Sequence, residues 1–180
     1  MTASTIKSEN ITNIEASPMT ALDQRQGVIR TIFDIDSIPT TSSDEIADIG
    51  LFGPIPSNAK ILDVLVLCDD LDSDSALRAD WGLYYSGIGG TQAEDGNTSG
   101  TAVDVDCFAT AHTVLSAPLT TWTSVRFEAD DIIDVNKEAW EVGGLTADPG
   151  GLFYVGYKVT TAGTSADEGD VVVRVDFIVG

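Results

Sequence analysis

Short runs of β-branched and apolar residues, separated by turn signals, are the feature that most constrains this fold. The strongest run is KILDVLVLC at residues 60–68, which is apolar at almost every position. Neighbouring side chains of a strand point to opposite faces, so this run predicts a strand covered on both faces or nearly so. The same criteria predict further strands at residues 28–36, 46–52, 77–85, 122–127, 152–160 and 170–179.

One stretch departs from this pattern and favours a helix. Apolar residues after the Gly- and Ser-rich stretch 86–102 are spaced i, i+1, i+4, i+7 and i+8 (Cys107, Phe108, Ala111, Val114 and Leu115). This spacing predicts a short helix over 106–116, with Asp104 or Asp106 as its cap and an end before Pro118. A second helical turn is predicted at 137–142, closed by Gly143 and Gly144.

Together these elements predict an all-β fold, an antiparallel β-sandwich of jelly-roll type with one or two short helical insertions. Helices long enough to cover a parallel sheet are missing from the pattern, which argues against an α/β fold. We expect residues 25–180 to form this single sandwich domain and residues 1–24, which are polar and aperiodic, to form an extended N-terminal arm. The Gly- and Ser-rich stretch 86–102 is predicted to be an exposed loop.

The charge balance narrows the possible partners. The chain has 29 Asp and Glu against 9 Lys and Arg, a formal net charge of −20. Such a surface repels the phosphates of nucleic acid and the anionic headgroups of a membrane. No run of 18 apolar residues is present either. We therefore expect neither nucleic acid nor a membrane to be a partner.

Residues suited to catalysis are scarce, and we do not expect an enzyme. His112 is the one histidine, and no serine lies in a GxSxG turn. Cys107 precedes His112 by five residues, whereas Cys–His pairs are normally assembled from distant segments. Cys68 and Cys107 could form a disulfide if the fold brings them together, but their apolar neighbours favour two buried thiols.

The acidic run 69–74 is the best place for a metal ion. Asp70, Asp72 and Asp74 match the first three ligand positions of a calcium loop, but Ser75 stands where the turn needs glycine and Trp81 where a bidentate Glu belongs. A loop of solvated aspartates explains the run better, and calcium remains a weaker alternative. No cofactor is expected.

The three tryptophans leave one further alternative open. Trp81, Trp122 and Trp140 could line a sugar-binding platform, although the predicted strands at 77–85 and 122–127, which hold two of them, favour core or interface anchors.

Several stretches resemble small virion proteins of tailed phages. They are IADIGLFGPIPSNAKILDVLVLCDDLDSDSALRADWGLY, DVDCFATAHTVLSA and EAWEVGGLTADPGGLFYVGYKVTT, which together cover roughly residues 46–160. The resemblance implies a decoration (cement) protein that binds the major capsid protein on the outer capsid surface, commonly as a homotrimer. Two alternatives stay open: a carbohydrate-binding or adhesive β-sandwich, and a virion component at a vertex, in the tail or at the connector.

Overall fold

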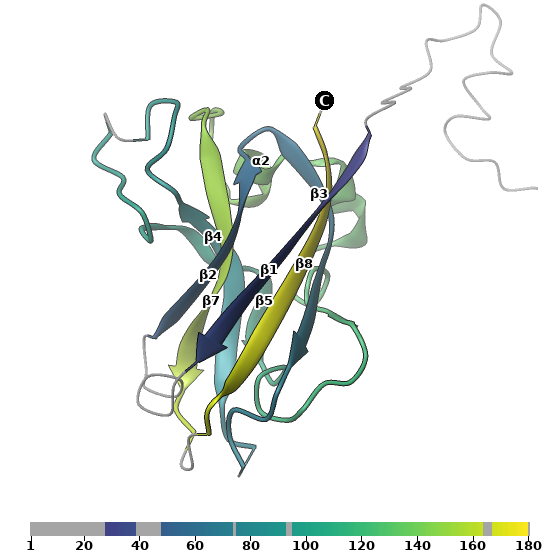
Figure 1. Cartoon of the computed structure of the whole chain (residues 1–180). Coiled ribbons are helices and arrows are strands. Elements are labelled where there is room, and N and C mark those ends of the chain that lie inside the picture. The colour runs from purple at the N-terminus through teal and green to yellow at the C-terminus, as the bar shows by residue number, and fades with distance from the viewer. Residues whose placement is uncertain (1–27, 39–47, 74, 93–94, 164–166, 180) are drawn as a thin grey trace, which may run out of the picture.

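The computed structural model describes residues 28–38, 48–73, 75–92, 95–163 and 167–179, and these form two antiparallel four-stranded sheets packed face to face (Figure 1). The first sheet has the strand order β1-β8-β3-β6, and the second has the order β2-β7-β4-β5. The strands of the first sheet are Ile29–Ile38 (β1), Gly169–Val179 (β8), Ala59–Cys68 (β3) and Thr123–Ser124 (β6). Those of the second are Ile49–Pro56 (β2), Leu152–Thr161 (β7), Arg78–Tyr85 (β4) and Ala102–His112 (β5). The predicted all-β sandwich is confirmed.

The order of pairing identifies the jelly roll. The first strand pairs with the last, the second with the seventh, the third with the sixth and the fourth with the fifth, all antiparallel. This is the path of one long double-stranded ribbon rolled up so that successive pairs fall alternately in the two sheets. The jelly-roll prediction is therefore confirmed at the level of strand order.

The core lies between the sheets and uses every second residue of the long strands. On β3 and β8 the inward positions are fully or almost fully buried (Val64, Val66, Val171, Val173 and Val175). They face a second layer of aromatic and aliphatic side chains (Phe52, Trp81, Leu83, Phe153, Val155 and Tyr157). Burial of these apolar side chains, at about 25 cal/mol per Å², is the main source of stability for such a layer pair.

The predicted helix at 106–116 is wrong, because residues 102–112 form strand β5. The register explains the misleading spacing: Leu83 pairs with Asp104, but Trp81, two residues earlier, pairs with Ala109. The extra residues of β5 bulge outward and break the two-residue period. Gly82 makes room for them, since a Cβ at this position would lie 2.1 Å from the carbonyl oxygen of Asp104. Asp104 and Asp106 therefore lie on a strand and cap no helix.

Two other predicted boundaries shift. β2 continues through Gly53 and Pro54 as far as Pro56, with a register shift between Phe52 and Ile55 and a positive φ of 113° at Gly53. Proline is tolerated there because β2 is an edge strand. The strand predicted at 122–127 is reduced to the two residues of β6.

The helical content is confined to two short insertions between β6 and β7. They are the 3-10 helix η1 (Ile132–Asn136) and the helix α2 (Ala139–Val142), which matches the predicted turn at 137–142. A reciprocal pair of bonds between Glu138 and Glu141 caps α2. None of the helices in the described part of the chain has the length and apolar character that a membrane span needs.

A buried arginine fixes the segment that leads into these insertions. Arg126 is fully buried, lies over the rings of Phe108 and Phe127 at 5.1 and 5.0 Å, and forms an ion pair with Asp130. The backbone N–H of Ala129 donates to the carbonyl of Phe108 at 2.9 Å. The segment therefore covers part of β5, an edge strand whose unpaired groups would otherwise be open to other chains.

Candidate interaction surface

The outer face of the first sheet carries a band of apolar side chains that no other part of the described chain covers. Phe33 on β1 pairs with Arg174 on β8, which pairs with Leu65 on β3. The next outward row along the strands is Ile35, Val172 and Leu67. Phe33 and Ile35 are 63% and 60% exposed. Two adjacent rows of the sheet thus present apolar groups away from the core.

Trp122 completes this band at the far side of the sheet. Ser124 pairs with Leu65 and Thr123 with Val66, so continuation of the register brings Trp122 level with Leu67. Its ring meets that of Phe33 in a T-shaped contact, with centroids 6.0 Å apart, and it remains 37% exposed. We call the six residues Phe33, Ile35, Leu65, Leu67, Trp122 and Val172 the apolar band.

A polar row bounds the band on one side. The carboxylate of Asp176 accepts hydrogen bonds from Arg174 Nε at 3.1 Å, from Arg174 Nη2 at 2.6 Å and from Thr31 Oγ1 at 2.6 Å. Burial acts to raise the pKa of Asp176, but these hydrogen bonds and the Arg174 charge outweigh it and hold the pKa below its usual value. Arg174 also lies 5.7 Å from the Phe33 ring. Its charge is thus matched within the chain.

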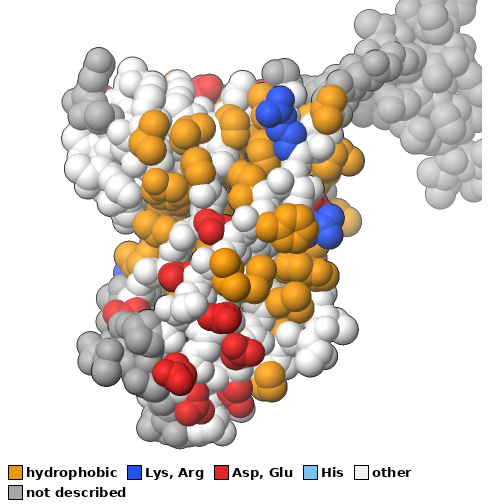
Figure 2. Space-filling model, viewed as in Figure 1, with side chains coloured by type: hydrophobic (Ala, Val, Ile, Leu, Met, Phe, Trp, Pro, Cys, Tyr) orange, Lys and Arg blue, Asp and Glu red, His pale blue; other side chains and the backbone are white. Residues whose placement is uncertain are grey.

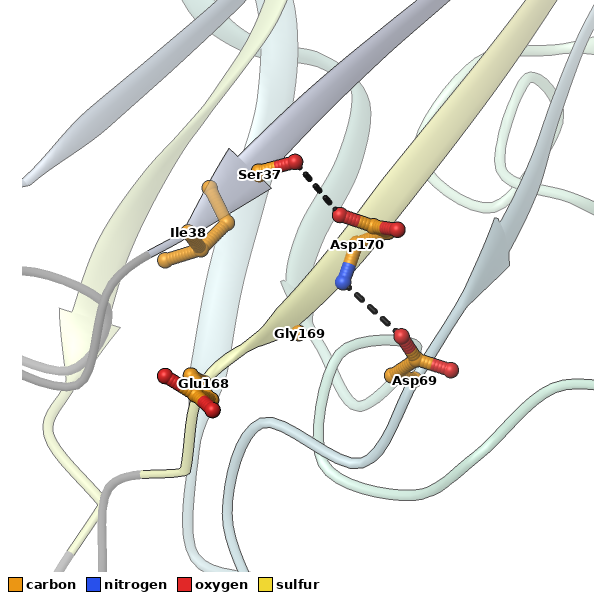
Figure 3. A pocket seen from close by; sticks show the side chains of 6 residues that line it. All are labelled: Ser37, Ile38, Asp69, Glu168, Gly169 and Asp170. Carbon is orange, nitrogen blue, oxygen red and sulfur yellow. Dashed lines mark hydrogen bonds between the residues drawn. The ribbon is translucent and has the colours of Figure 1, made fainter.

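Acidic side chains bound the band on the other side. Ser37 Oγ donates to Asp170 Oδ1 at 2.6 Å, and the backbone N–H of Asp170 donates to Asp69 Oδ2 at 2.9 Å (Figure 3). Ser37, Asp69 and Asp170 line a surface pocket together with Glu168. The side chains of Asp69, Glu168 and Asp170 are all exposed. We call Asp69, Glu168 and Asp170 the acidic end. Figure 2 shows apolar side chains over this face of the molecule and acidic ones gathered towards its lower end.

Sequence reasoning missed this surface as a site, although its signal was present. The run at 60–68 predicted a strand covered on both faces. The structure covers the inward residues completely, but leaves Leu65 and Leu67 only partly buried. The apolar residues on the outer side of β3 are therefore the sequence signal that indicates an interface on this face.

The weak calcium site at Asp70, Asp72 and Asp74 is only partly visible. Asp72 is fully buried, and its Oδ2 accepts the N–H groups of Ala76 and Leu77 at 2.6 and 2.7 Å. Asp70 Oδ1 accepts the N–H of Asp72 at 3.2 Å, while Asp74 lies outside the described residues. Asp72 thus holds its own loop together, and calcium binding there stays a prediction. Within the described ranges, no three His, Cys, Asp or Glu side chains form a group suited to a metal ion.

The residues considered for nucleophilic chemistry are not activated. His112 Nδ1 accepts the N–H of Val114 at 3.0 Å, and burial lowers the histidine pKa. Both cysteines are free thiols. Burial raises the pKa of Cys68 to about 11 and that of Cys107 still further, so both stay protonated at neutral pH.

The three tryptophans do not form one platform. Trp81 is fully buried in the core, and Trp122 belongs to the apolar band. Trp140 is half-buried and donates its indole N–H to Glu138 at 2.7 Å. The reading of Trp81 as a core anchor is confirmed, and this side chain cannot meet a sugar.

The long loop after β4 is held at one point by a buried glutamine. Gln92 is fully buried, and its Nε2 donates to the carbonyls of Gly150 and Leu152 at 2.8 and 3.0 Å. The N–H of Thr91 donates to the carbonyl of Pro149 at 2.8 Å. The loop is therefore tied to the predicted Asp148–Gly151 turn, which directly precedes β7.

Comparison with known proteins gives relatives by structure alone. No protein-family model matches the chain, and no curated protein matches it. Two solved structures share its fold. A chain of the "Capsid of Ralstonia phage GP4" matches with a TM-score of 0.57 and 19% identity over 90% of this chain and 91% of that one. A chain of the "Cyanophage Pam1 capsid asymmetric unit" matches with a TM-score of 0.50 and 14% identity over 89% and 92%. The resemblance to phage virion proteins thus holds for the fold.

Proposed function

We propose that this chain is a non-enzymatic structural protein of a phage virion, and specifically a decoration protein of the head. The observation that carries the proposal is the shared jelly roll, which extends over about nine-tenths of both this chain and the two phage capsid chains. The proposed partner is the major capsid protein, and the proposed place is the outer capsid surface.

The charge of the chain supports the outer surface over the inner one. A net charge of −20 would bring strong repulsion against packaged DNA, whose phosphates bind proteins through Lys and Arg. The outer surface imposes no such cost. A protein that binds the assembled shell but not the free subunits stabilises the shell by mass action. We propose further that the protein forms a homotrimer. Residues 1–24 lie outside the described residues, and their role in attachment is also part of the proposal.

The experiment is removal of the gene from the virus that encodes the chain, followed by addition of purified protein. Heads lacking the protein should form but should lose DNA at a lower temperature, and the added protein should restore the original temperature. Heads of unchanged stability would contradict the decoration role. Failure to assemble would point instead to an essential vertex, tail or connector component.

A further inference from the structure

We propose that the apolar band and the acidic end are the surface by which the chain docks on its partner. The partner surface is inferred to be a protein surface with an apolar centre and a rim of Lys and Arg. This inference rests on the proposed function, in which the partner is a subunit of the shell, and it adds which face makes the contact and what chemistry the face selects.

The first argument is the cost of leaving the band uncovered. Phe33, Ile35 and Trp122 keep 63%, 60% and 37% of their surface exposed, although a jelly roll can place polar residues on this face. Contiguous exposed apolar groups edged by polar ones mark interaction sites in soluble proteins. Aromatic side chains are also the residues most often found at the energetic centre of an interface.

The second argument is the rigidity of the band. Leu65, Leu67 and Val172 lie on the two central strands, and β8 is hydrogen-bonded on both sides. The contact between Phe33 and Trp122 fixes the two outermost rings against each other. A surface that is ordered before binding loses little conformational entropy in the complex.

The size of the face brings the acidic end into the contact. With strands about 4.8 Å apart and alternate residues about 6.7 Å apart, four strands and five rows span roughly 14 by 27 Å. The projected area, about 400 Å², is half of the roughly 800 Å² that each partner buries in a standard interface. The band fills only two of these five rows, and the last row carries Asp170 beside Asp69. A stable contact must therefore cover the acidic end as well as the band, and must continue past the edge of the sheet.

Charge then decides between a second copy and a different partner. The nearest cation on the face, Arg174, is already paired with Asp176, so the free charge around the band is negative. A second copy would bring another 20 negative charges towards this face. A partner with Lys and Arg opposite the acidic end gains attraction and a faster association rate instead.

The test measures binding of purified protein to heads from a virus that lacks this gene. The double variant Phe33→Ser with Ile35→Ser should bind at least about tenfold more weakly, as expected for residues at the centre of an interface. Ile88→Ser is the matched control, since Ile88 is 53% exposed but lies in the loop after β4. Its binding should be unchanged. Circular dichroism should show the same fold for all three proteins.

A charge variant tests the other half of the inference. Glu168→Gln should weaken binding about two- to fivefold and reduce its dependence on salt. If wild type binds heads and both variants bind equally well, the docking surface is refuted while the proposed function stands. If wild type does not bind, both fail. If Phe33→Ser with Ile35→Ser instead dissociates an oligomer of wild type, the face is covered by a second copy and the proposal is overturned.

Discussion

The ring of Trp122 meets the ring of Phe33 at 6.0 Å, although Phe33 lies on one edge strand of the sheet, β1, and Trp122 directly precedes the opposite edge strand, β6. The contact passes over the outer side of the central strands and not through the core. It belongs to the apolar band, so we expect Trp122 to contribute to binding and less to stability than a core residue does.

Trp122→Ala should therefore lower the free energy of unfolding by about 2 kcal/mol, because it removes the ring contact with Phe33 and a side chain that is still 37% exposed. Trp81→Ala, which removes a fully buried ring, should cost about 3–5 kcal/mol. Urea unfolding followed by circular dichroism measures both. Similar losses for the two variants would contradict the assignment of Trp122 to the surface.

Gly82 should tolerate no side chain, because the bulge of β5 fills the space beside it. Its Cβ would lie 2.1 Å from the Asp104 carbonyl oxygen, a contact with backbone that cannot rotate away. Gly82→Ala should lower the free energy of unfolding, measured by urea unfolding, by about 3 kcal/mol or more. Gly96→Ala is the control: nothing lies within 4 Å, so only its positive φ of 77° counts, at about 1–2 kcal/mol. Equal losses would argue against the bulge.

This bulge also shows where reading the sequence failed. The apolar spacing from Cys107 to Leu115 matched a helix, because extra residues of β5 between Asp104 and Ala109 broke the strand period. The bulge depends on Gly82, a residue of another strand, and no local pattern reveals such a pairing. By contrast, the strands at 60–68, 77–85, 152–160 and 170–179 were predicted closely, because each is a continuous run between turn signals.

The proposed interface could be predicted only in part. The outward residues Leu65 and Leu67 already indicated a strand apolar on both sides. The residues that lie beside Leu65 and Leu67 in the apolar band cannot be predicted from local sequence, because they are on β1 and β8, which are far apart in the chain. Sheet order brings Phe33 and Val172 beside them, and it depends on long-range pairing.

The ion pair of Arg126 and Asp130 should be costly to break from one side. Asp130→Ala leaves a fully buried guanidinium without its partner and should lower the free energy of unfolding by about 3 kcal/mol. Arg126→Met combined with Asp130→Ala removes both charges and keeps contact with Phe108. The free energy of unfolding of this double variant, measured by urea unfolding, should therefore be close to that of wild type. A double variant as unstable as the single one would show that the pair itself carries the stability.

Asp176 should make the protein more sensitive to acid. Its pKa is lowered in the folded state, so its contribution is full at neutral pH and is lost as pH falls below about 4 through the folded-state pKa. Asp176→Asn should therefore be less stable than wild type at pH 7, with the difference shrinking towards pH 2.5. Urea unfolding across this range measures it, and a constant difference would contradict the lowered pKa.

The central claim is that this protein decorates a phage head. The most direct measurement is its copy number in purified particles of the virus that encodes it, relative to the major capsid protein, by quantitative mass spectrometry. We expect a number of copies comparable to that of the major capsid protein. A few copies per particle, or none, would contradict it.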